Sequence, residues 1–244
     1  MKVRKPASRK DLSIRKEFRV LDIGGGHNPH PRANVVVDKY INDNTHRGRD
    51  IRVLHNQEFI HADGEHLPFK DKEFDYVICC HVLEHVENPE QFVAEQSRVA
   101  PRGYIETPSL LGEFLAPKES HKWVLQEIDN KIVLYEKEKI DFRPQYDFGD
   151  LFLYYLPKIS VGYKIIERTQ PDLFTLRHEW KDNIEILVNP DSSYYREFFT
   201  KPWDEKFYDK VFQPRSLGQE GLAALSAIVE ITGSVFKSKI LKRS

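Results

Sequence analysis

The sequence predicts an α/β protein with a doubly wound, mostly parallel sheet that includes an antiparallel C-terminal strand. Short apolar segments alternate with polar or helical ones over residues 18–108, as in α/β sheets. Two segments, 34–38 and 74–80, are nearly continuous apolar runs, which is typical of parallel strands buried on both faces. The segments also stop at Gly, Asp or His, and ligands bind near the carboxyl ends of parallel strands.

The first half of the chain supplies five expected strands and one helix. We expect the strands at 18–23, 34–38, 58–63, 74–80 and 104–108. The helix starts after Asn88, which can cap it, with Pro89 in its first turn. Gln91 lies three residues after Asn88 and completes the spacing of a capping box. Pro101 and Gly103 end this helix before the fifth strand.

Beyond residue 110 the pattern changes. Apolar and polar residues alternate on both sides of Asp129-Asn130, which predicts a hairpin over 123–137 inside an insertion of about 112–146. A helix is expected at 147–156, ending before Pro157. The final strands are expected at 163–168, 172–180 and 184–189, with the last two paired antiparallel.

The two ends of the chain are basic and lie outside the predicted domain of residues 18–215. The first nineteen residues hold eight Lys or Arg against Asp11 and Glu17. We interpret residues 1–17 as a solvated tail, with contact to an acidic partner or substrate as the alternative. Residues 216–244 are expected to form an amphipathic helix with a basic tail. Its stripe would pack on the core, with peripheral membrane contact as the alternative, and consists of Leu222, Leu225, Ile228/Val229 and Val235/Phe236.

The overall composition is that of an ordinary globular protein, with 40% hydrophobic and 31% charged residues and a formal net charge of −1. This charge indicates neither nucleic acid nor membrane as a general partner. We expect no secretory signal, since no apolar segment follows the basic start, and no membrane-spanning segment. The adjacent Cys79 and Cys80 suit a buried strand rather than a disulfide, so a cytoplasmic location is expected.

A glycine-rich turn, VLDIGGG (20–26), joins the first two strands. A dinucleotide site needs a third glycine and a helix whose N-terminus holds the pyrophosphate, but Pro29 stands where that glycine belongs. Pro29 and Pro31 leave room for one helical turn at most. Asp38 follows Gly24 by fourteen positions rather than the roughly twenty of the NAD pattern. These features argue against an NAD site.

The chain resembles class I S-adenosylmethionine (SAM) dependent methyltransferases of the type-11 group over about residues 18–109. Four blocks carry the resemblance: VLDIGGG (20–26), VVVDKY (35–40), ADGEHLPFKDKEFDYVICCHVLEHVENP (62–89) and GYIETPS (103–109). The resemblance implies a Rossmann-like fold with a shortened first helix and SAM as the cofactor. SAM has no phosphate, so it can use the glycine turn without the helix.

The same resemblance implies which residues bind SAM. Asp22, Gly24 and Gly26 would border its methionine end, and Asp38 would bond the ribose hydroxyls. Asp63 would accept a hydrogen bond from the adenine amino group, beside Gly64 and Glu65, and the backbone of His81 would meet the methionine amine. Each strand-end Asp has the alternative role of capping a turn. His27-Asn28 replaces the family's frequent third glycine, which leaves the methionine contacts open.

Three histidines are candidates for a catalytic base, namely His81, His85 and His121, with Glu106 a weaker candidate. Imidazole titrates near neutral pH and could take the proton from a hydroxyl acceptor. His121 precedes the predicted hairpin, which from that position could act as a lid. Glu84 and His85 could instead orient the helix after the fourth strand. We expect no metal site, because the histidines lack a ligand spacing such as H-x-x-x-H on a helix.

The predicted function is transfer of a methyl group from SAM to an oxygen or nitrogen of a small molecule, sugar or lipid-linked glycan. Aromatic residues beyond 110, such as Trp123 and Tyr146, could stack on a sugar. One alternative is a SAM-binding, catalytically idle partner subunit. Another is an RNA or protein methyltransferase, which is disfavoured because CCHVLEH (79–85) stands where an N-P-P-Y tetrapeptide would lie. The sequence does not reveal the oligomeric state.

Overall fold

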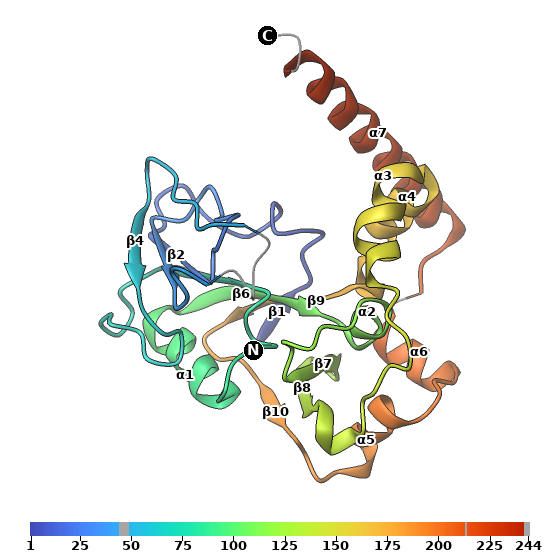
Figure 1. Cartoon of the computed structure of the whole chain (residues 1–244), viewed down its shortest axis with the longest axis horizontal. Coiled ribbons are helices and arrows are strands. Elements are labelled where there is room, and N and C mark those ends of the chain that lie inside the picture. Colours follow the sequence, from blue (N-terminus) through green and yellow to red (C-terminus); the bar gives the residue numbers. More distant parts are fainter. Residues whose placement is uncertain (44–48, 213, 242–244) are drawn as a thin grey trace.

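A seven-stranded sheet in the order β1-β9-β6-β5-β2-β3-β4 forms the centre of the protein (Figure 1). The computed structural model describes residues 1–43, 49–212 and 214–241. The strands of this sheet are β1 (Lys2–Arg4), β2 (Val20–Ile23), β3 (Val35–Asp38), β4 (Glu58–His61), β5 (Tyr76–Cys80), β6 (Arg102–Pro108) and β9 (Thr175–Lys181). The α/β class is therefore confirmed.

Strand directions also agree with the predicted sheet. β4, β3, β2, β5 and β6 are mutually parallel, and β9 pairs antiparallel with β6. The parallel part of the sheet starts in the middle at β2 and proceeds first to β3 and β4, then to β5 on the other side of β2. The order thus reverses between β2 and β5, and the crevice at the carboxyl ends of these two strands is where open α/β sheets bind ligands.

The first connection contains no helix over residues 24–34, so the shortened first helix that was expected is absent, although the two prolines allowed one turn at most. Its turns are instead held by hydrogen bonds: the Asn28 N–H donates to the Gly25 carbonyl and the Ala33 N–H donates to the His30 carbonyl. The helix α1 (Pro89–Val99) follows β5, and the Asn88 side chain caps it by accepting from the Gln91 N–H. The other half of the predicted capping box is replaced, because the Gln91 amide donates to the Glu65 carbonyl.

Alternate residues of the central strands enter two different cores. One face packs against α1 and a second sheet, with Leu21, Val35, Val77, Cys79 and Ile105 buried. The opposite face, which includes Tyr76, Ile78 and Tyr104, packs against Leu12, Ile14 and Phe18 of the N-terminal segment. Residues 12–18 therefore cover the face that the missing first helix leaves open.

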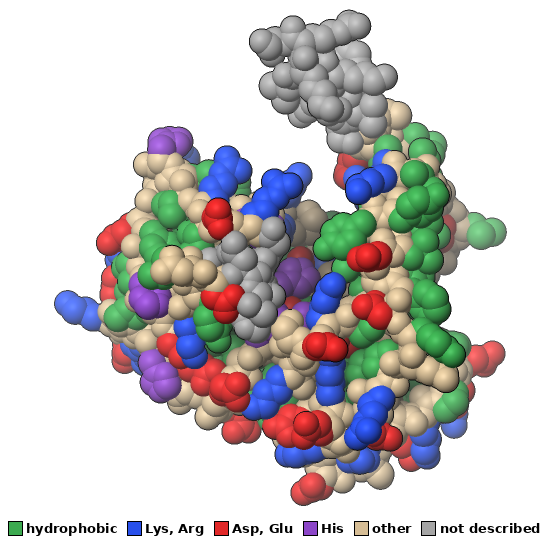
Figure 2. Space-filling view, in the orientation of Figure 1, with side chains coloured by type: hydrophobic (Ala, Val, Ile, Leu, Met, Phe, Trp, Pro, Cys, Tyr) green, Lys and Arg blue, Asp and Glu red, His purple; other side chains and the backbone are tan. Residues whose placement is uncertain are grey.

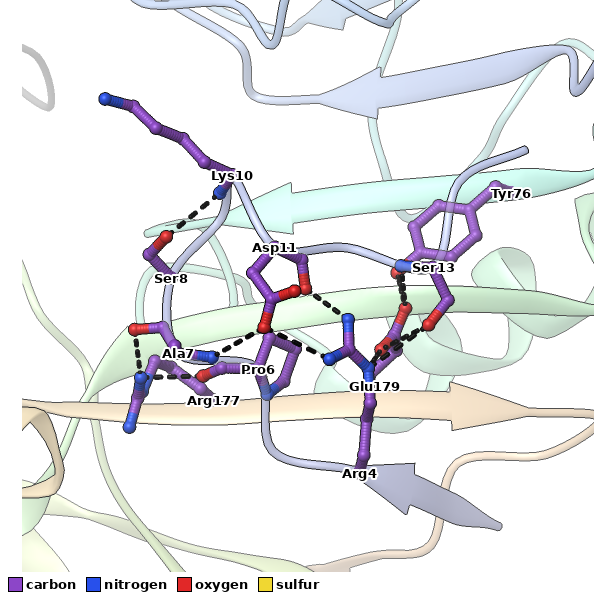
Figure 3. Close-up of polar contacts among 10 residues, drawn as sticks. All are labelled: Arg4, Pro6, Ala7, Ser8, Lys10, Asp11, Ser13, Tyr76, Arg177 and Glu179. Atoms are coloured by element: carbon purple, nitrogen blue, oxygen red, sulfur yellow. Dashed lines mark hydrogen bonds and ion pairs between the residues drawn. The ribbon is translucent and has the colours of Figure 1, made fainter. Parts of the chain in front are cut away.

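The basic N-terminal segment is part of the sheet edge, contrary to the solvated tail expected for residues 1–17. β1 pairs antiparallel with β9. The buried Glu179 accepts hydrogen bonds from the Ser13 N–H (2.8 Å), the Tyr76 hydroxyl (2.6 Å) and Arg4 Nε (2.5 Å) (Figure 3). Arg177 Nη1 donates to the carbonyls of Pro6 and Ala7 in the same view. Arg4 of this segment thus meets a partner that lies 175 residues away in the sequence.

The hairpin prediction is confirmed, but the hairpin lies in the core rather than forming a lid. β7 (Trp123–Ile128) and β8 (Lys131–Glu136) pair antiparallel across Asp129 and Asn130, which both have positive φ. The strand expected at 184–189 is β10 (Ile186–Val188), and it pairs parallel with β8 in this second sheet. The predicted antiparallel pairing of 184–189 with 172–180 is therefore wrong.

The structure is helical at two other places where the sequence predicted a helix end or a strand. A π-helical turn (Leu151–Tyr155) leads into α3 (Leu156–Ile159), so the helix continues through Pro157 instead of ending before it. Residues 163–168, expected as a strand, lie in α4 (Val161–Thr169), capped by the Ser160 hydroxyl. The remaining helical elements are α2 (Leu110–Leu115), α5 (Ser193–Thr200), α6 (Glu205–Val211), α7 (Leu217–Leu241) and two 3₁₀ turns (Lys137–Ile140, Pro171–Leu173).

The helix α7 packs beside α4 and projects away from the sheet (Figure 1). Among the side chains of α7 that the structure describes, Ala227 and Ile231 are buried, whereas Leu222 and Leu225 are 70% and 61% exposed; the side chains of Val235 and Phe236 lie outside the described part. The predicted stripe is therefore not the face that packs on the core. Residues 242–244 of the expected basic tail lie outside the described residues. Among the described helices, none is long and apolar enough to cross a membrane.

Candidate functional site

A cavity of about 460 Å³ lies at the carboxyl ends of β2, β3 and β5, where the strand order reverses. Its lining includes every residue that the sequence assigned to the cofactor: Asp22, Gly24, Gly26, Asp38, Asp63, Gly64, Glu65 and His81. His85 lines it as well, but His121 does not. The space-filling view shows a hollow beside the helices α3, α4 and α7, here called the helical arm, with histidine side chains inside it (Figure 2).

The glycine turn forms one wall by bringing bare backbone to the cavity. Gly24 has a φ of +69° and Gly26 a φ of +52°, both in the left-handed region that favours glycine. A Cβ atom on Gly24 would lie 2.2 Å from Val82 Cγ2. The Gly24 N–H donates to the Val37 carbonyl at 2.7 Å, which fixes this turn against the end of β3. A side chain is thus excluded here by both conformation and space.

Asp22 is a buried carboxylate directly before this turn. Its Oδ2 accepts a hydrogen bond from the His30 N–H at 2.7 Å and lies 4.0 Å from Arg9 Nη2. Burial raises the pKa of Asp22 from 3.8 to about 6, although the His30 N–H and Arg9 oppose this and the charge of Asp38 adds to it. Asp22 therefore holds the shortened loop in place and can change charge in mildly acidic solution.

We expect the affinity for SAM to fall as the pH falls through 6. Protonation below the pKa of Asp22 removes the negative charge that would face the methionine ammonium of SAM. With a pKa of about 6, binding should be about tenfold weaker at pH 5 than at pH 7, as measured by calorimetry. The Asp22→Asn variant should bind weakly at both pH values. If Asp22→Asn keeps the wild-type pH dependence of SAM affinity, Asp22 only supports the loop.

Asp38 and Asp63 stand at the ends of neighbouring strands. Asp38 Oδ1 accepts from the Tyr40 N–H at 3.0 Å, and its side chain lines the cavity. Asp63 Oδ1 accepts from the Glu65 N–H, and Oδ2 pairs with Lys39 Nζ at 2.7 Å. Burial alone would raise the pKa of Asp63, but Lys39 and the Glu65 N–H hold it below its ordinary value. An adenine amino group would therefore share this carboxylate with Lys39.

His81 lies directly after β5 and has a φ of +57°, and its N–H donates to the Glu106 carbonyl at 2.8 Å. Its ring lies between two carboxylates, with Nδ1 3.4 Å from Glu84 Oε1 and Nε2 3.5 Å from Glu106 Oε1. Burial would lower the pKa of His81, but the neighbouring carboxylates of Glu106 and Glu84 raise it above 6.5. A cationic imidazole cannot accept a proton, which argues against His81 as the base.

A second polar cluster adjoins the cavity, formed by Glu84, His85 and His121. The rings of His85 and His121 meet edge to face at a centroid distance of 4.7 Å. His85 Nδ1 lies 2.9 Å from the Ser120 carbonyl oxygen, and His121 Nδ1 lies 2.6 Å from Glu113 Oε2. One donor atom from each of the three side chains lies within 4.8 Å of the others. His121 thus reaches the site through His85.

Sequence reasoning missed three residues of this region. Arg9 lines the cavity from the N-terminal segment, and its carbonyl oxygen lies 2.9 Å from His30 Nε2. Lys39 pairs with Asp63, and the buried Glu113 accepts from both His121 and Lys137 Nζ. The position of Lys39 next to Asp38 in the sequence could have placed it at the site. No sequence feature indicated Arg9 or Glu113, because their contacts depend on tertiary packing.

The cavity meets the requirements of SAM on three counts. Carboxylates from the ends of β2 and β3 and from the loop after β4 face one space, so they can bind the ammonium, hydroxyls and amino group of one nucleoside. The backbone at Gly24 lines the cavity without a side chain, and a Cβ atom there would clash with Val82, another lining residue. The volume of about 460 Å³ is within the range of small-molecule sites. The residues present therefore fit this cofactor.

Comparison with known proteins points to the same family. Residues 36–106 match the family model for a type-11 methyltransferase domain. An uncharacterised protein of Methanocaldococcus jannaschii, MJ1123, is 42% identical over 64 residues, which are 24% of this chain and 31% of that protein. The ubiquinone/menaquinone biosynthesis C-methyltransferase UbiE of Pseudomonas fluorescens is 34% identical over 103 residues, which are 37% of this chain and 40% of that enzyme. The chain thus spans less than half the length of these curated relatives.

Solved structures with a similar fold include two bacterial or archaeal proteins. The YcgJ protein of Bacillus subtilis is 24% identical, with a TM-score of 0.36, over 46% of this chain and 57% of that one. The PH0226 protein of Pyrococcus horikoshii is 25% identical, with a TM-score of 0.34, over 50% of this chain and 67% of that one.

Proposed function

We propose that this chain, which contains a type-11 domain of the class I SAM-dependent methyltransferases, transfers a methyl group from SAM to an oxygen or nitrogen of a small-molecule or glycan acceptor. The observation that carries the proposal is the cavity at the strand-order reversal, which collects strand-end carboxylates and a glycine turn. An oxygen acceptor is favoured because a cluster of imidazoles and carboxylates adjoins this cavity.

Each part of the cavity has a distinct role in this proposal. Asp22 binds the methionine ammonium, Asp38 binds the ribose hydroxyls, and Asp63 with the Gly64 backbone meets the adenine. When bound, SAM supplies a methyl group made electrophilic by its sulfonium. The contribution of the protein is mainly alignment, which holds the acceptor atom in line with the carbon–sulfur bond.

The acceptor is expected on the side of His81, His85 and the helical arm. The hollow in Figure 2 opens there, with histidines inside it and apolar side chains of the arm at its rim. A hydroxyl acceptor must lose its proton as the oxygen–carbon bond forms. We assign this task to the cluster of Glu84, His85 and His121, because His85 lines the cavity while the cationic His81 can only donate.

The function is tested by incubating the protein with isotope-labelled methyl donor and extracts, followed by mass spectrometry. A labelled product in the metabolite or glycan fraction is expected, whereas label in RNA or protein would replace the proposed acceptor class. SAM binding without transfer to any fraction would identify an idle subunit. Binding is measured separately by stability, since SAM at a hundred times its dissociation constant should add about 2.7 kcal/mol.

The Asp38→Ala variant should bind SAM about 10- to 100-fold more weakly, because a charge-assisted hydrogen bond is worth about 1.5–3 kcal/mol. Its fold should be intact, since the Asp38 side chain is only partly buried. Glu58→Ala is the matched control, an exposed acid at the start of the neighbouring strand β4. Equal calorimetric affinities of the two variants and the wild type would contradict the site assignment.

A further inference from the structure

We propose that Glu84, His85 and His121 form a binding site for a divalent transition-metal ion at the edge of the cavity. This site departs from the sequence-based expectation of no metal. The three residues occupy two segments, 84–85 and 121, that fold together after β5 and before β7. The Lys122 and Trp123 N–H groups both donate to the Glu84 carbonyl, at 2.9 and 3.1 Å, and hold His121 beside His85.

The hydrogen bonds of both imidazoles prepare them for metal binding. Nδ1 of His85 donates to the Ser120 carbonyl and Nδ1 of His121 donates to the Glu113 carboxylate. A metal-bound histidine ordinarily donates one ring N–H to a carbonyl or carboxylate, which orients the ring and leaves the other nitrogen to coordinate. Glu113 is itself held by Lys137 Nζ at 2.6 Å. Nε2 is therefore the coordinating atom of each ring in this arrangement.

Glu84 supplies the independent reason for a cation. Its side chain is 1% exposed, and within the part of the chain that the structure describes neither carboxylate oxygen accepts a hydrogen bond. Its ion-pair contact is His81 Nδ1, 3.4 Å from Oε1. A buried carboxylate without hydrogen bonds is costly unless cations compensate it, and a metal ion would add to the compensation that His81 gives through this ion pair. One of the carboxylate oxygens of Glu84 lies within 4.8 Å of a ring nitrogen of each imidazole and can complete the ligand set.

The donor set selects the kind of metal. Two imidazoles and one carboxylate suit Zn²⁺ and similar first-row ions, whereas Mg²⁺ and Ca²⁺ prefer sites made of oxygen alone. Ligand atoms about 2.0–2.1 Å from a tetrahedral zinc lie about 3.4 Å apart, so binding should draw the three donors closer together. Three protein ligands leave a coordination position open. If the proposed function holds, an acceptor hydroxyl bound there would have a lowered pKa and would release its proton to water, so the cluster would act on the hydroxyl through the ion and not as a free base.

The test measures Zn²⁺ binding by the chelator-stripped full chain, by calorimetry without SAM, together with the visible spectrum of the Co²⁺ form. One bound ion per chain is expected, with affinity reduced roughly 100-fold or more in Glu84→Gln and His121→Asn. His55→Asn is the control, since His55 is exposed and outside the cluster. Thermal unfolding should show all three variants folded, with Zn²⁺ stabilising only the wild type and the control.

Two outcomes would overturn the metal site. One is the absence of a stoichiometric ion, and the other is an affinity that the Glu84 and His121 variants do not change, which would place the ion elsewhere. Binding of S-adenosylhomocysteine to the same samples separates this result from the proposed function. If the protein binds the nucleoside but no metal, only the metal site is contradicted. If it binds metal but no nucleoside, only the proposed function is contradicted.

Discussion

Replacing Glu179 by alanine is expected to lower the free energy of unfolding by about 3–5 kcal/mol. Glu179 is 2% exposed and accepts from the Tyr76 hydroxyl, the Ser13 N–H and hydroxyl, and Arg4 Nε. Its removal leaves the Tyr76 hydroxyl without its acceptor inside the core. Arg4 contributes less, because it is about one third exposed and water screens its charge. Urea denaturation followed by circular dichroism measures the change.

The loss should extend to the N-terminal segment as a whole, because Glu179 holds Ser13 between Leu12 and Ile14, which cover the second face of the sheet. Glu179→Gln should lose less, since an amide oxygen can still accept one of these bonds. Glu17→Ala is the control, an exposed acid on the same segment. A loss below about 1 kcal/mol in Glu179→Ala would mean that the network behaves like an exposed ion pair.

The Gly24→Ala substitution should destabilise the protein by about 2–4 kcal/mol and weaken SAM binding at the same time. An alanine with a φ of +69° is strained by about 1 kcal/mol or more, and its Cβ atom would lie 2.2 Å from Val82 Cγ2. Relief of that contact must move Val82, which also lines the cavity. Denaturation and calorimetry with S-adenosylhomocysteine measure the two effects.

A double variant separates the two causes. Adding Val82→Ala removes the atom that clashes but leaves the strained conformation, so part of the stability should return. Gly221→Ala is the matched control, because a Cβ atom there meets nothing within 4 Å in the helix α7. That substitution should stabilise the helix by up to about 1 kcal/mol. A Gly24→Ala protein with wild-type stability and affinity would show that the turn tolerates a side chain.

Elements with strong local signals were predicted well. The apolar runs at 34–38 and 74–80 are the buried strands β3 and β5, and Asn88 caps α1 as its position indicated. All eight residues assigned to the cofactor line one cavity, because the carboxyl ends of parallel strands meet at one edge of the sheet. Their individual contacts with SAM stay predictions.

For short amphipathic segments, the local sequence pattern did not distinguish a strand from a helix or identify the pairing partner. Residues 163–168 suit a strand or one face of a helix, and the structure places them in α4 because Ser160 caps it and α7 packs against it. The pairing of β10 with β8 likewise reflects packing, since a three-residue strand carries little information about its partner.

The amino-acid sequence alone determines the parallel strands, the glycine turn with room for one helical turn at most, and the carboxylates at the strand ends. Hydrophobic pattern, proline and glycine determine these features because each acts on the backbone conformation of a few neighbouring residues. Tertiary structure alone decided that Arg4 meets Glu179, that residues 12–18 replace a helix, and that His121 joins Glu84 and His85. These contacts join distant segments, and their energies depend on burial and orientation, which appear only once the chain has folded.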